Sequence, residues 1–520
     1  MQMGNDPAAE NALSNKWLSP LAFICYIAAL KLLIQLIFSG GYGYFRDELY
    51  YLECGEHLDW GYVDHAPLIA LISKASRVVF GDSMFGIRFL PAVAGAGKVL
   101  LTGLIVRELG GRRFAVILSC LCVLSSAYLA LDSFLSMNAF EGVFWTGCIL
   151  SFIFAVKRNN PRYWVIFGLL AGIGLLNKHS TLFFGSAIFA GILLTKARSL
   201  LAGKWIWIGG VIALLIFLPN LIWEWQHDWA TVELLRNVQA TGKNVALSPA
   251  EFILVNILEM GLLGAPIWIA GLIYFLFDRT GKRFRALGIA YLVLLTEMIL
   301  MNGKAYYMYS IYPMLFAGGG VYIEYLLTKT KRLGFLKVAY PSLLIAGMLI
   351  TMPFALPVLP VETFLRYQTA LGFQAPKTEV AFDSPLPQIF ADRFGWPEMV
   401  HKVAEAYNRL PEEDKEKTAI FAGNYGQAGA VDFFGPKYGL PKAISGHQNY
   451  FFWGPRHYTG EVMILLGIDL KAAETLFNSV EEAGVVSHPY TMSYEHFTIL
   501  ICRGLKTPLP ELWPHLKFWN

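Results

Sequence analysis

Charged side chains are scarce in this chain. Only 15% of its 520 residues are Asp, Glu, Lys or Arg, whereas 55% are hydrophobic, and the mean hydropathy is +0.47. Soluble domains carry about 25% charged residues. This composition excludes an ordinary soluble globular protein and indicates an integral membrane protein.

Cysteines are also few, and the chain has no internal repeat and no low-complexity tract. The six cysteines show neither disulfide nor metal-site spacing. Only Cys54 and Cys502 fall in segments expected on the oxidising side of the membrane. We therefore expect free thiols.

Long apolar runs recur through the first two thirds of the chain. A helix needs about 20 residues to cross the hydrocarbon core. The pattern predicts eleven spans, although the pair within 162–195 can also be interpreted as one broken helix. The runs are 17–39, 84–106, 114–132, 139–157, 162–177, 180–195, 204–223, 252–277, 284–301, 305–325 and 338–356.

Basic residues gather in one set of loops. Five alternate loops, near residues 110, 160, 200, 282 and 332, hold 17 Lys and Arg side chains, and the intervening loops hold few. Because basic loops stay cytoplasmic, we expect a cytoplasmic N-terminus, an external loop 40–83 and an external C-terminus. The first apolar run is too long for a signal-peptide core, so we interpret it as an uncleaved anchor.

The composition changes near residue 357. Residues 358–520 hold 14 basic and 18 acidic side chains. Apolar runs at 418–423, 462–467 and 496–502 predict buried strands, and 396–409 and 470–483 predict helices. The chain is thus predicted to have a membrane domain at 1–357 and an extracytoplasmic α/β domain at 358–520.

Acidic residues are concentrated in the first outer loop. Asp47 and Glu48 open a predicted helix at 47–58, Asp64 and His65 precede a second one at 66–80, and Asp132 follows the third span. Both loop helices have the pattern of helices lying in the membrane interface. Acids at a helix start also serve as caps, but repeated acids at one membrane face indicate chemistry or ion handling.

Outer-side basic residues are rare. Arg88, Lys178, His179 and Lys304 lie at predicted outer ends of spans. Each alone is compatible with a stray topology violation, whereas together they would form a cationic ring suited to a lipid phosphate. His227 and Asp228 follow span seven; they either bind a cation or substrate, or decorate an aromatic belt.

These motifs, in this order, resemble the membrane C-type glycosyltransferases, the group of the dolichyl-phosphate-mannose protein mannosyltransferases and the lipid A aminoarabinose transferase. The resemblance rests on Asp47-Glu48, Asp64-His65-Ala66-Pro67-Leu68, Asp132, Asn177-Lys178-His179-Ser180 and Lys304-Ala-Tyr-Tyr307, and covers 17 to about 356. His65 stands where the aminoarabinose transferase has a lysine, and Ala66 replaces the first proline of the motif.

The resemblance implies an all-α polytopic bundle of about eleven helices with the C-type glycosyltransferase fold, followed by the α/β domain. It implies sugar transfer from a polyprenyl-phosphate donor to an acceptor hydroxyl at the outer face of a bacterial inner membrane. The acceptor is a lipid, a glycan or a protein, and no nucleic-acid partner is indicated.

The resemblance also assigns roles to residues. Asp47 is the expected general base, and Glu48 and Asp132 orient the acceptor or support the base. The residues expected to hold the donor phosphate are His65, Arg88, Lys178, Lys304 and Tyr307. A divalent metal ion bound through Asp64 and His227 is left open; no other cofactor is indicated. No matched residue lies in the tail, so we expect the tail to shape acceptor binding.

Two other classes of function remain open. Intramembrane charge is also compatible with a transporter or flippase of lipid-linked sugars. Against this, the acids gather at one membrane face and no inverted repeat is present. A scaffold or adhesion protein that acts through its tail ranks last.

Overall fold

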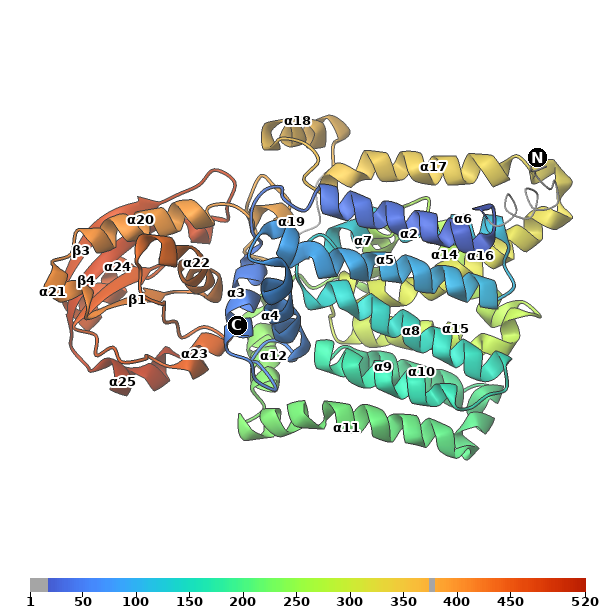
Figure 1. Ribbon diagram of the computed structural model, residues 1–520, viewed down its shortest axis with the longest axis horizontal. Coiled ribbons are helices and arrows are strands. Elements are labelled where there is room, and N and C mark those ends of the chain that lie inside the picture. The colour runs from blue at the N-terminus through green and yellow to red at the C-terminus, as the bar shows by residue number, and fades with distance from the viewer. Residues whose placement is uncertain (1–16, 374–378) are drawn as a thin grey trace, which may run out of the picture. The chain divides into compact units, whose positions relative to one another are not determined.

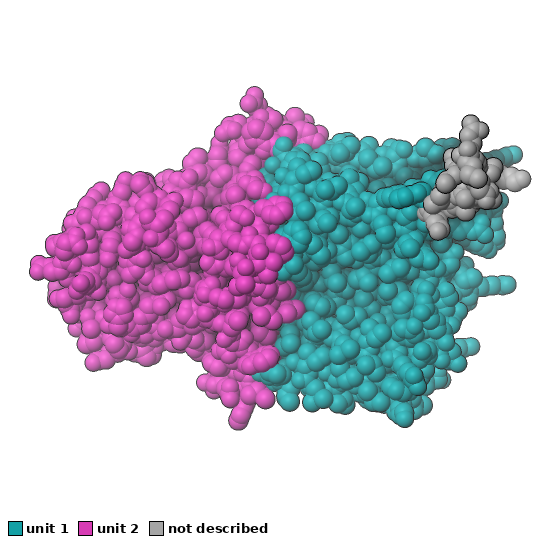
Figure 2. Space-filling view, in the orientation of Figure 1, with its two compact units in different colours: residues 1–39, 88–219, 246–358 teal, residues 40–87, 220–245, 359–520 magenta. Residues whose placement is uncertain are grey.

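The computed structural model describes residues 17–373 and 379–520. Within it the chain forms two compact units, shown in different colours in Figure 2. Unit 1 comprises Met1–Ser39, Arg88–Pro219 and Ala246–Val358; unit 2 comprises Gly40–Ile87, Asn220–Val245 and Leu359–Asn520. Residues 40–87 and 220–245 therefore group with residues 359–520.

The described part of unit 1 is helical, and its long helices lie side by side (Figure 1). Apolar side chains from most of these helices share one core. The helices are α2 (Pro20–Ile37), α5 (Met84–Glu108), α6 (Arg113–Cys122), α7 (Ser126–Leu131), α8 (Met137–Lys157), α9 (Tyr163–Asn177), α10 (Thr181–Leu193), η1 (Lys196–Ala202), α11 (Lys204–Gln226), α13 (Pro249–Glu259), α14 (Ala265–Phe277), η2 (Gly281–Phe284), α15 (Arg285–Leu300), η3 (Ala305–Ile311), α16 (Tyr312–Lys329), η4 (Lys331–Leu333), α17 (Leu336–Thr351) and η5 (Met352–Phe354).

Every predicted apolar run is helical, but several runs are interrupted. The run 114–132 divides into α6 and α7, 252–277 into α13 and α14, and 305–325 into η3 and α16. One break contains Gly261, whose φ of 84° leaves the right-handed helical region. The ambiguous stretch 162–195 forms two helices, α9 and α10.

Five helices in the described part of the chain are long and apolar enough to cross a membrane: α2, α5, α8, α11 and Leu336–Phe354. The pair α10 and η1, bent by 106°, would make a sixth. The structure therefore supports a multi-helix membrane protein, and the number eleven is not confirmed.

Glycines bring some of these helices into close contact. A Cβ on Gly271 of α14 would overlap the carbonyl oxygen of Leu315, and one on Gly319 of α16 would overlap that of Ile267. Lipid provides no hydrophobic drive for helices to associate, so small residues that allow close backbone packing stabilise such pairs.

Membrane orientation yields a testable expectation. In a Cys25→Ser background, Lys282→Cys should react with an impermeant thiol reagent only from the cytoplasm, and Glu482→Cys only from outside. Both side chains are exposed. The expectation rests on the 17 basic residues confined to one set of loops. Cytoplasmic labelling of Glu482→Cys would contradict an external tail.

Unit 2 contains a four-stranded sheet in the order β1-β2-β4-β3, with β1 and β2 parallel and the other pairs antiparallel. The strands are β1 (Thr418–Ala422), β2 (Val462–Leu466), β3 (Phe477–Val486) and β4 (Phe497–Leu505). The three predicted strands are confirmed. Every residue of β1 and β2 is buried, because both faces of the sheet are covered.

The predicted helix 470–483 is wrong in its second half. Helix α24 (Leu470–Leu476) ends where β3 begins. Strand β3 lies at the edge of the sheet, and most of its side chains are exposed or half-buried. It therefore lacks the continuous apolar run that identified the other strands.

The helices of unit 2 include both predicted loop helices and the predicted helix 396–409, all confirmed within two residues. All six cysteines are free thiols, as expected. The helices are α3 (Arg46–Glu56), α4 (Leu68–Phe80), α12 (Ala230–Thr241), α18 (Val361–Leu371), α19 (Gln388–Ala391), α20 (Trp396–Asn408), α21 (Glu412–Lys415), α22 (Tyr425–Phe434), η6 (Gly435–Tyr438), α23 (Asn449–Trp453), η7 (Ser493–Glu495), α25 (Leu509–Leu512) and η8 (Trp513–Leu516).

Candidate functional site

The predicted site residues divide between the two units. Unit 2 holds the first-loop residues and the residue after α11, and unit 1 holds the remaining acid and the phosphate candidates. The unit 2 set is Asp47, Glu48, Asp64, His65 and His227; the unit 1 set is Arg88, Asp132, Lys178, Lys304 and Tyr307.

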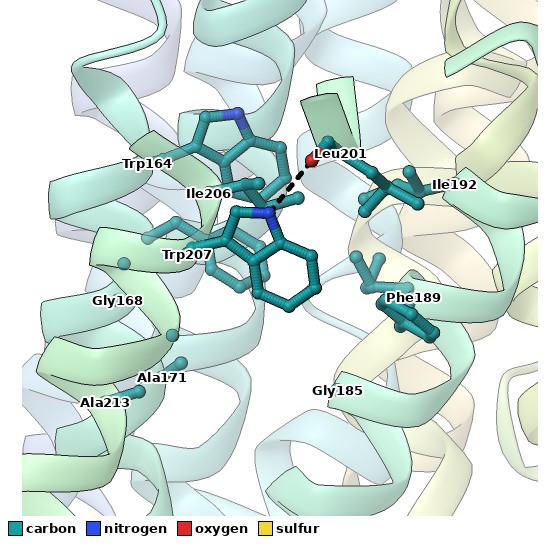
Figure 3. Close-up of a pocket in the computed structure, with 14 residues that line it drawn as sticks. Trp164, Gly168, Ala171, Gly185, Phe189, Ile192, Leu201, Ile206, Trp207 and Ala213 are labelled. Carbon is teal, nitrogen blue, oxygen red and sulfur yellow. Dashed lines mark hydrogen bonds between the residues drawn. The ribbon is translucent and has the colours of Figure 1, made fainter. Parts of the chain in front are cut away.

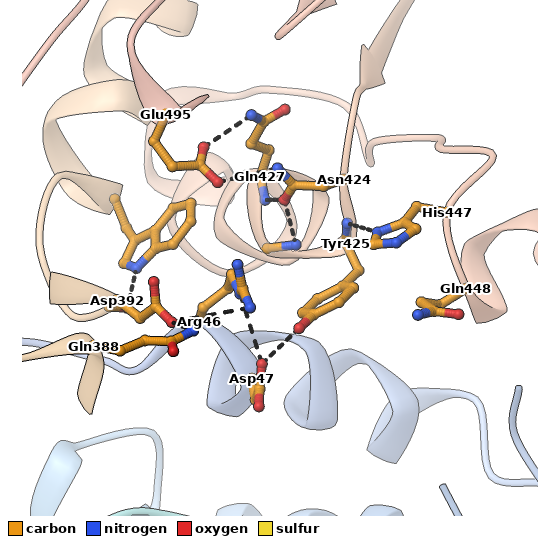
Figure 4. Close-up of polar contacts among 12 residues, drawn as sticks. Arg46, Asp47, Gln388, Asp392, Asn424, Tyr425, Gln427, His447, Gln448 and Glu495 are labelled. Atoms are coloured by element: carbon orange, nitrogen blue, oxygen red, sulfur yellow. Dashed lines mark hydrogen bonds and ion pairs between the residues drawn. The ribbon is translucent and has the colours of Figure 1, made fainter. Parts of the chain in front are cut away.

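Asp47 lies in the first turn of α3, and 29% of its side chain is exposed. Its Oδ1 accepts a hydrogen bond from the Tyr425 hydroxyl at 2.7 Å, and the Arg46 Nε lies 3.7 Å from the same oxygen (Figure 4). The carboxylate is thus partly exposed and oriented by one hydroxyl, and its role as general base stays a prediction.

Glu48 caps helix α3, which is the alternative role that the sequence left open for the acidic pair Asp47-Glu48. Its side chain is buried, and Oε2 accepts a hydrogen bond from the backbone N–H of Phe45 at 2.8 Å. This is the reciprocal half of a capping box at the start of α3. The capping alternative thus applies to Glu48, and its predicted catalytic role stays a prediction.

Asp64 and His65 lie in an aromatic environment. The Tyr50 hydroxyl donates to Asp64 Oδ1 at 2.9 Å, and the buried His65 ring stacks on Tyr62 with centroids 4.5 Å apart. Burial raises the pKa of Asp64 to about 7; the Tyr50 hydrogen bond opposes this shift and the charge of Asp47 adds to it. Asp64 is therefore partly protonated near neutral pH.

His227 stacks on Trp223 with centroids 4.1 Å apart, and its Nδ1 lies 2.8 Å from the Trp223 carbonyl oxygen. These contacts match the alternative in which His227 belongs to an aromatic belt. Residues 17–373 and 379–520 contain no group of three or more His, Cys, Asp or Glu side chains that could hold a metal ion. The metal site at Asp64 and His227 stays a prediction.

In unit 1 the phosphate candidates Lys178 and Tyr307 come together. The Lys178 ammonium lies 4.3 Å from the centre of the Tyr307 ring and donates to Asn138 Oδ1 at 2.8 Å. Burial lowers the pKa of Lys178; Glu141 opposes this shift and the positive charge of Lys304 adds to it. Positive charge and an aromatic ring thus come together at this place in unit 1.

The sequence reasoning missed Glu141, the acid of this cluster. Its buried carboxylate accepts hydrogen bonds from Ser180 and Ser310 and lies 3.7 Å from the Lys178 ammonium. A glutamate near the start of an apolar run was the available signal, because a carboxylate there needs a partner. Glu141 thus orients the lysine.

Arg88 and Asp132 have protein partners of their own. The buried Arg88 guanidinium donates to the Ser39 carbonyl oxygen. Asp132 pairs with Lys31, 2.7 Å away, and with Lys98, and both ammonium groups lie over the Tyr128 ring. The outer-face acid of the sequence analysis is therefore a fully enclosed ion triad, and its catalytic role stays a prediction.

An apolar pocket of about 210 Å³ lies among α9, α10 and α11 (Figure 3). Trp207 donates its indole N–H to the Leu201 carbonyl at 2.9 Å, and glycines such as Gly185 and Gly210 leave the space open. None of the predicted site residues lines it. The pocket is lined almost entirely by apolar side chains.

Comparisons with known proteins agree with the motifs. Residues 64–223 match the family described as dolichyl-phosphate-mannose-protein mannosyltransferase. The lipid A galacturonosyltransferase RgtD of Rhizobium johnstonii is 29% identical over 204 residues. That match covers 38% of this chain and only 41% of the relative's length.

Solved structures extend the likeness to nearly the whole chain. ArnT from Cupriavidus metallidurans bound to undecaprenyl phosphate has a TM-score of 0.58 at 13% identity, covering 92% of this chain and 98% of ArnT. Its apo form gives 0.57 at 12% identity, covering 92% and 97%. The predicted resemblance is thus confirmed: this chain has the C-type glycosyltransferase fold of ArnT and resembles the dolichyl-phosphate-mannose-protein mannosyltransferases in sequence.

Proposed function

We propose that this protein is a membrane glycosyltransferase that moves a sugar from a polyprenyl-phosphate donor to an acceptor hydroxyl. The observation that carries the proposal is that Lys178 lies 4.3 Å from the centre of the Tyr307 ring and feels the positive charge of Lys304. We assign this cluster to the donor phosphate. The ArnT fold supports it, since ArnT was solved with undecaprenyl phosphate.

The proposed reaction is a single displacement. The acceptor oxygen attacks the anomeric carbon and gives its proton to Asp47, while the bond from that carbon to the phosphate oxygen breaks. The polyprenyl phosphate leaves with the electron pair, and the anomeric configuration inverts. A phosphate is a good leaving group, so the protein supplies a base and cations that stabilise the departing charge.

The acceptor in this proposal is a lipid at the outer face of a bacterial inner membrane. The likeness to RgtD, named as a lipid A galacturonosyltransferase, supports a lipid acceptor. A protein or glycan acceptor and the class of sugar remain outcomes of the assay. The alternative of a transporter predicts movement of the lipid-linked sugar across a bilayer without a new glycosidic bond.

The direct test uses full-length protein in proteoliposomes. Undecaprenyl phosphate carrying a radiolabelled galacturonosyl, aminoarabinosyl or mannosyl group is supplied together with lipid A. We expect label in lipid A from one donor, with release of undecaprenyl phosphate and without a nucleotide. Donor translocation with no label in lipid A, or in any protein or glycan offered, would reject the proposal.

Lys304→Ala should weaken donor binding. A hydrogen bond to a charged group contributes about 1.5–3 kcal/mol, so the donor Kd should rise by about tenfold or more. Binding of labelled undecaprenyl phosphate to purified protein measures this directly. Lys282→Ala, at an exposed lysine of the predicted cytoplasmic side, is the matched control. Equal affinities of the two variants would remove Lys304 from the phosphate site.

A further inference from the structure

The motif Asn424-Tyr-Gly-Gln-Ala-Gly429 has no role in the function proposed so far. It forms the start of α22, with Asn424 as the N-cap that accepts hydrogen bonds from the backbone N–H groups of Gly426 and Gln427. Tyr425 is the first residue of the helix. Its hydroxyl donates to Asp47, which lies 378 residues earlier in the chain.

Glycines allow α22 to reach α3 within unit 2. A Cβ on Gly426 would overlap the Arg46 side chain, and one on Gly429 would lie 2.9 Å from the Leu49 carbonyl carbon. The two glycines are three residues apart and therefore share one face of α22. Larger residues would separate the helices, so these glycines set the distance from Tyr425 to Asp47.

The Tyr425 ring is held on several sides. It stacks on His447 with centroids 5.0 Å apart and lies 4.8 Å from the Tyr50 ring, and the Arg46 guanidinium lies 5.3 Å from its centre. The Tyr425 backbone N–H donates to His447 Nδ1 at 3.1 Å. Burial lowers the pKa of His447 to about 3, with the charges of Lys243 and Arg46 adding to the shift, so the imidazole is neutral and Nδ1 can accept.

A second set of contacts fixes the start of α3 to the C-terminal residues of unit 2 (Figure 4). The Arg46 backbone N–H donates to the Asp392 carbonyl at 2.9 Å, and its guanidinium donates to the Tyr494 hydroxyl. Glu495 accepts hydrogen bonds from Asn424 at 3.0 Å and Gln427 at 2.9 Å. These contacts hold α22, which carries Tyr425, and the start of α3, which carries Asp47.

We propose that Tyr425 is a positioning residue for the base: its hydroxyl holds the Asp47 carboxylate in one orientation. The inference rests on the proposed function, because it assigns Asp47 the role of base. It extends the expectation that the tail shapes acceptor binding. The charged and titratable groups of unit 2 that interact with Asp47 are Arg46, Tyr51, Asp64, Asp392 and Tyr425.

Tyr425→Phe tests this role with little change of shape. We expect kcat to fall by about tenfold, the contribution of one such hydrogen bond, with donor Kd unchanged. A positioning role therefore lowers kcat alone, and donor Kd measured on the same preparation separates it from a general loss of structure. The matched control is Tyr490→Phe, whose hydroxyl donates to Glu362 in the same unit. A wild-type kcat in Tyr425→Phe would overturn the proposal.

Gly429→Ala tests the geometry without touching either hydrogen-bonding group. The added Cβ meets the backbone of Leu49 and Tyr50, so α22 must move away from α3. We expect the same fall in kcat with unchanged donor Kd as in Tyr425→Phe. In Gly484→Ala an added Cβ meets nothing within 4 Å, and this control should behave as wild type. Loss of stability in Gly429→Ala with a wild-type kcat would contradict the proposal.

A stability cycle keeps this inference separable from the proposed function. Melting temperatures are compared for wild type, Tyr425→Phe, Asp47→Ala and the double variant. Because both substitutions remove the same hydrogen bond, the sum of the two single-variant shifts in melting temperature should exceed the shift of the double variant. If the two shifts are additive, the Tyr425–Asp47 hydrogen bond does not couple the two residues, and the proposal is overturned even in an active enzyme. An inactive wild type with non-additive shifts would reject the glycosyltransferase proposal and the base role of Asp47 together, and would leave the contact standing.

Discussion

Asp47→Asn is expected to reduce turnover by at least about a hundredfold, because general-base catalysis contributes about 10²–10⁴-fold. Asparagine has the size and shape of aspartate and can still accept the hydrogen bond from Tyr425, but it cannot take a proton. Donor affinity should change little, because the phosphate is assigned to the basic residues of unit 1. Steady-state transfer and donor binding to the same preparation measure the two effects.

The capping explanation of the acidic pair predicts a different result. Asparagine caps helices about as well as aspartate, and the reciprocal cap of α3 is made by Glu48. A pure capping role for Asp47 would leave Asp47→Asn nearly silent. Asp469→Asn is the matched control, since Asp469 is the N-cap of α24 in the same unit. If both variants turn over at the wild-type rate, the mechanism has no base.

Asp132→Asn is expected to lower the free energy of unfolding by about 3–5 kcal/mol, the usual cost of removing one member of a buried ion pair. Asp132 is fully buried between Lys31 and Lys98. Without its charge, two ammonium groups would remain close together in a poorly hydrated interior. Denaturant unfolding of the detergent-solubilised protein measures the loss.

Second-site and surface variants separate this effect from catalysis. Lys98→Met in the Asp132→Asn background removes one of the two uncompensated charges and should restore part of the stability. Glu56→Gln breaks ion pairs with Lys74 and Arg77 at a glutamate side chain that is 37% exposed, and it should cost at most about 1 kcal/mol. Normal stability of Asp132→Asn with lost turnover would instead favour the catalytic role that the sequence predicts.

The positions of the helices follow closely from the local spacing of apolar residues. Each apolar run forms helix, and both first-loop helices lie within two residues of their predicted bounds. These features depend on residues three and four positions apart, which are visible in one stretch of chain. Breaks inside apolar runs are less visible, because an apolar helix and an apolar turn have the same composition.

Strand β3 and the role of Glu48 required the tertiary structure. An edge strand buries few side chains, so Phe477–Val486 carries no apolar run and its preceding helix appeared longer. Asp47 and Glu48 are adjacent and chemically alike, yet only Glu48 turns back to the Phe45 N–H. The orientation of each carboxylate depends on what packs against α3.

The sequence by itself determined the membrane character, the helical runs, three of the four strands and the acidic and basic motifs that carry the likeness to a glycosyltransferase family. Only the tertiary structure decided the partners of those residues: Lys31 and Lys98 for Asp132, Glu141 for Lys178, and Tyr425 for Asp47. The reason is physical. Charge, hydropathy and period are properties of neighbouring residues, whereas a carboxylate enclosed in a protein takes whichever partner the fold brings within hydrogen-bonding distance, at any separation along the chain.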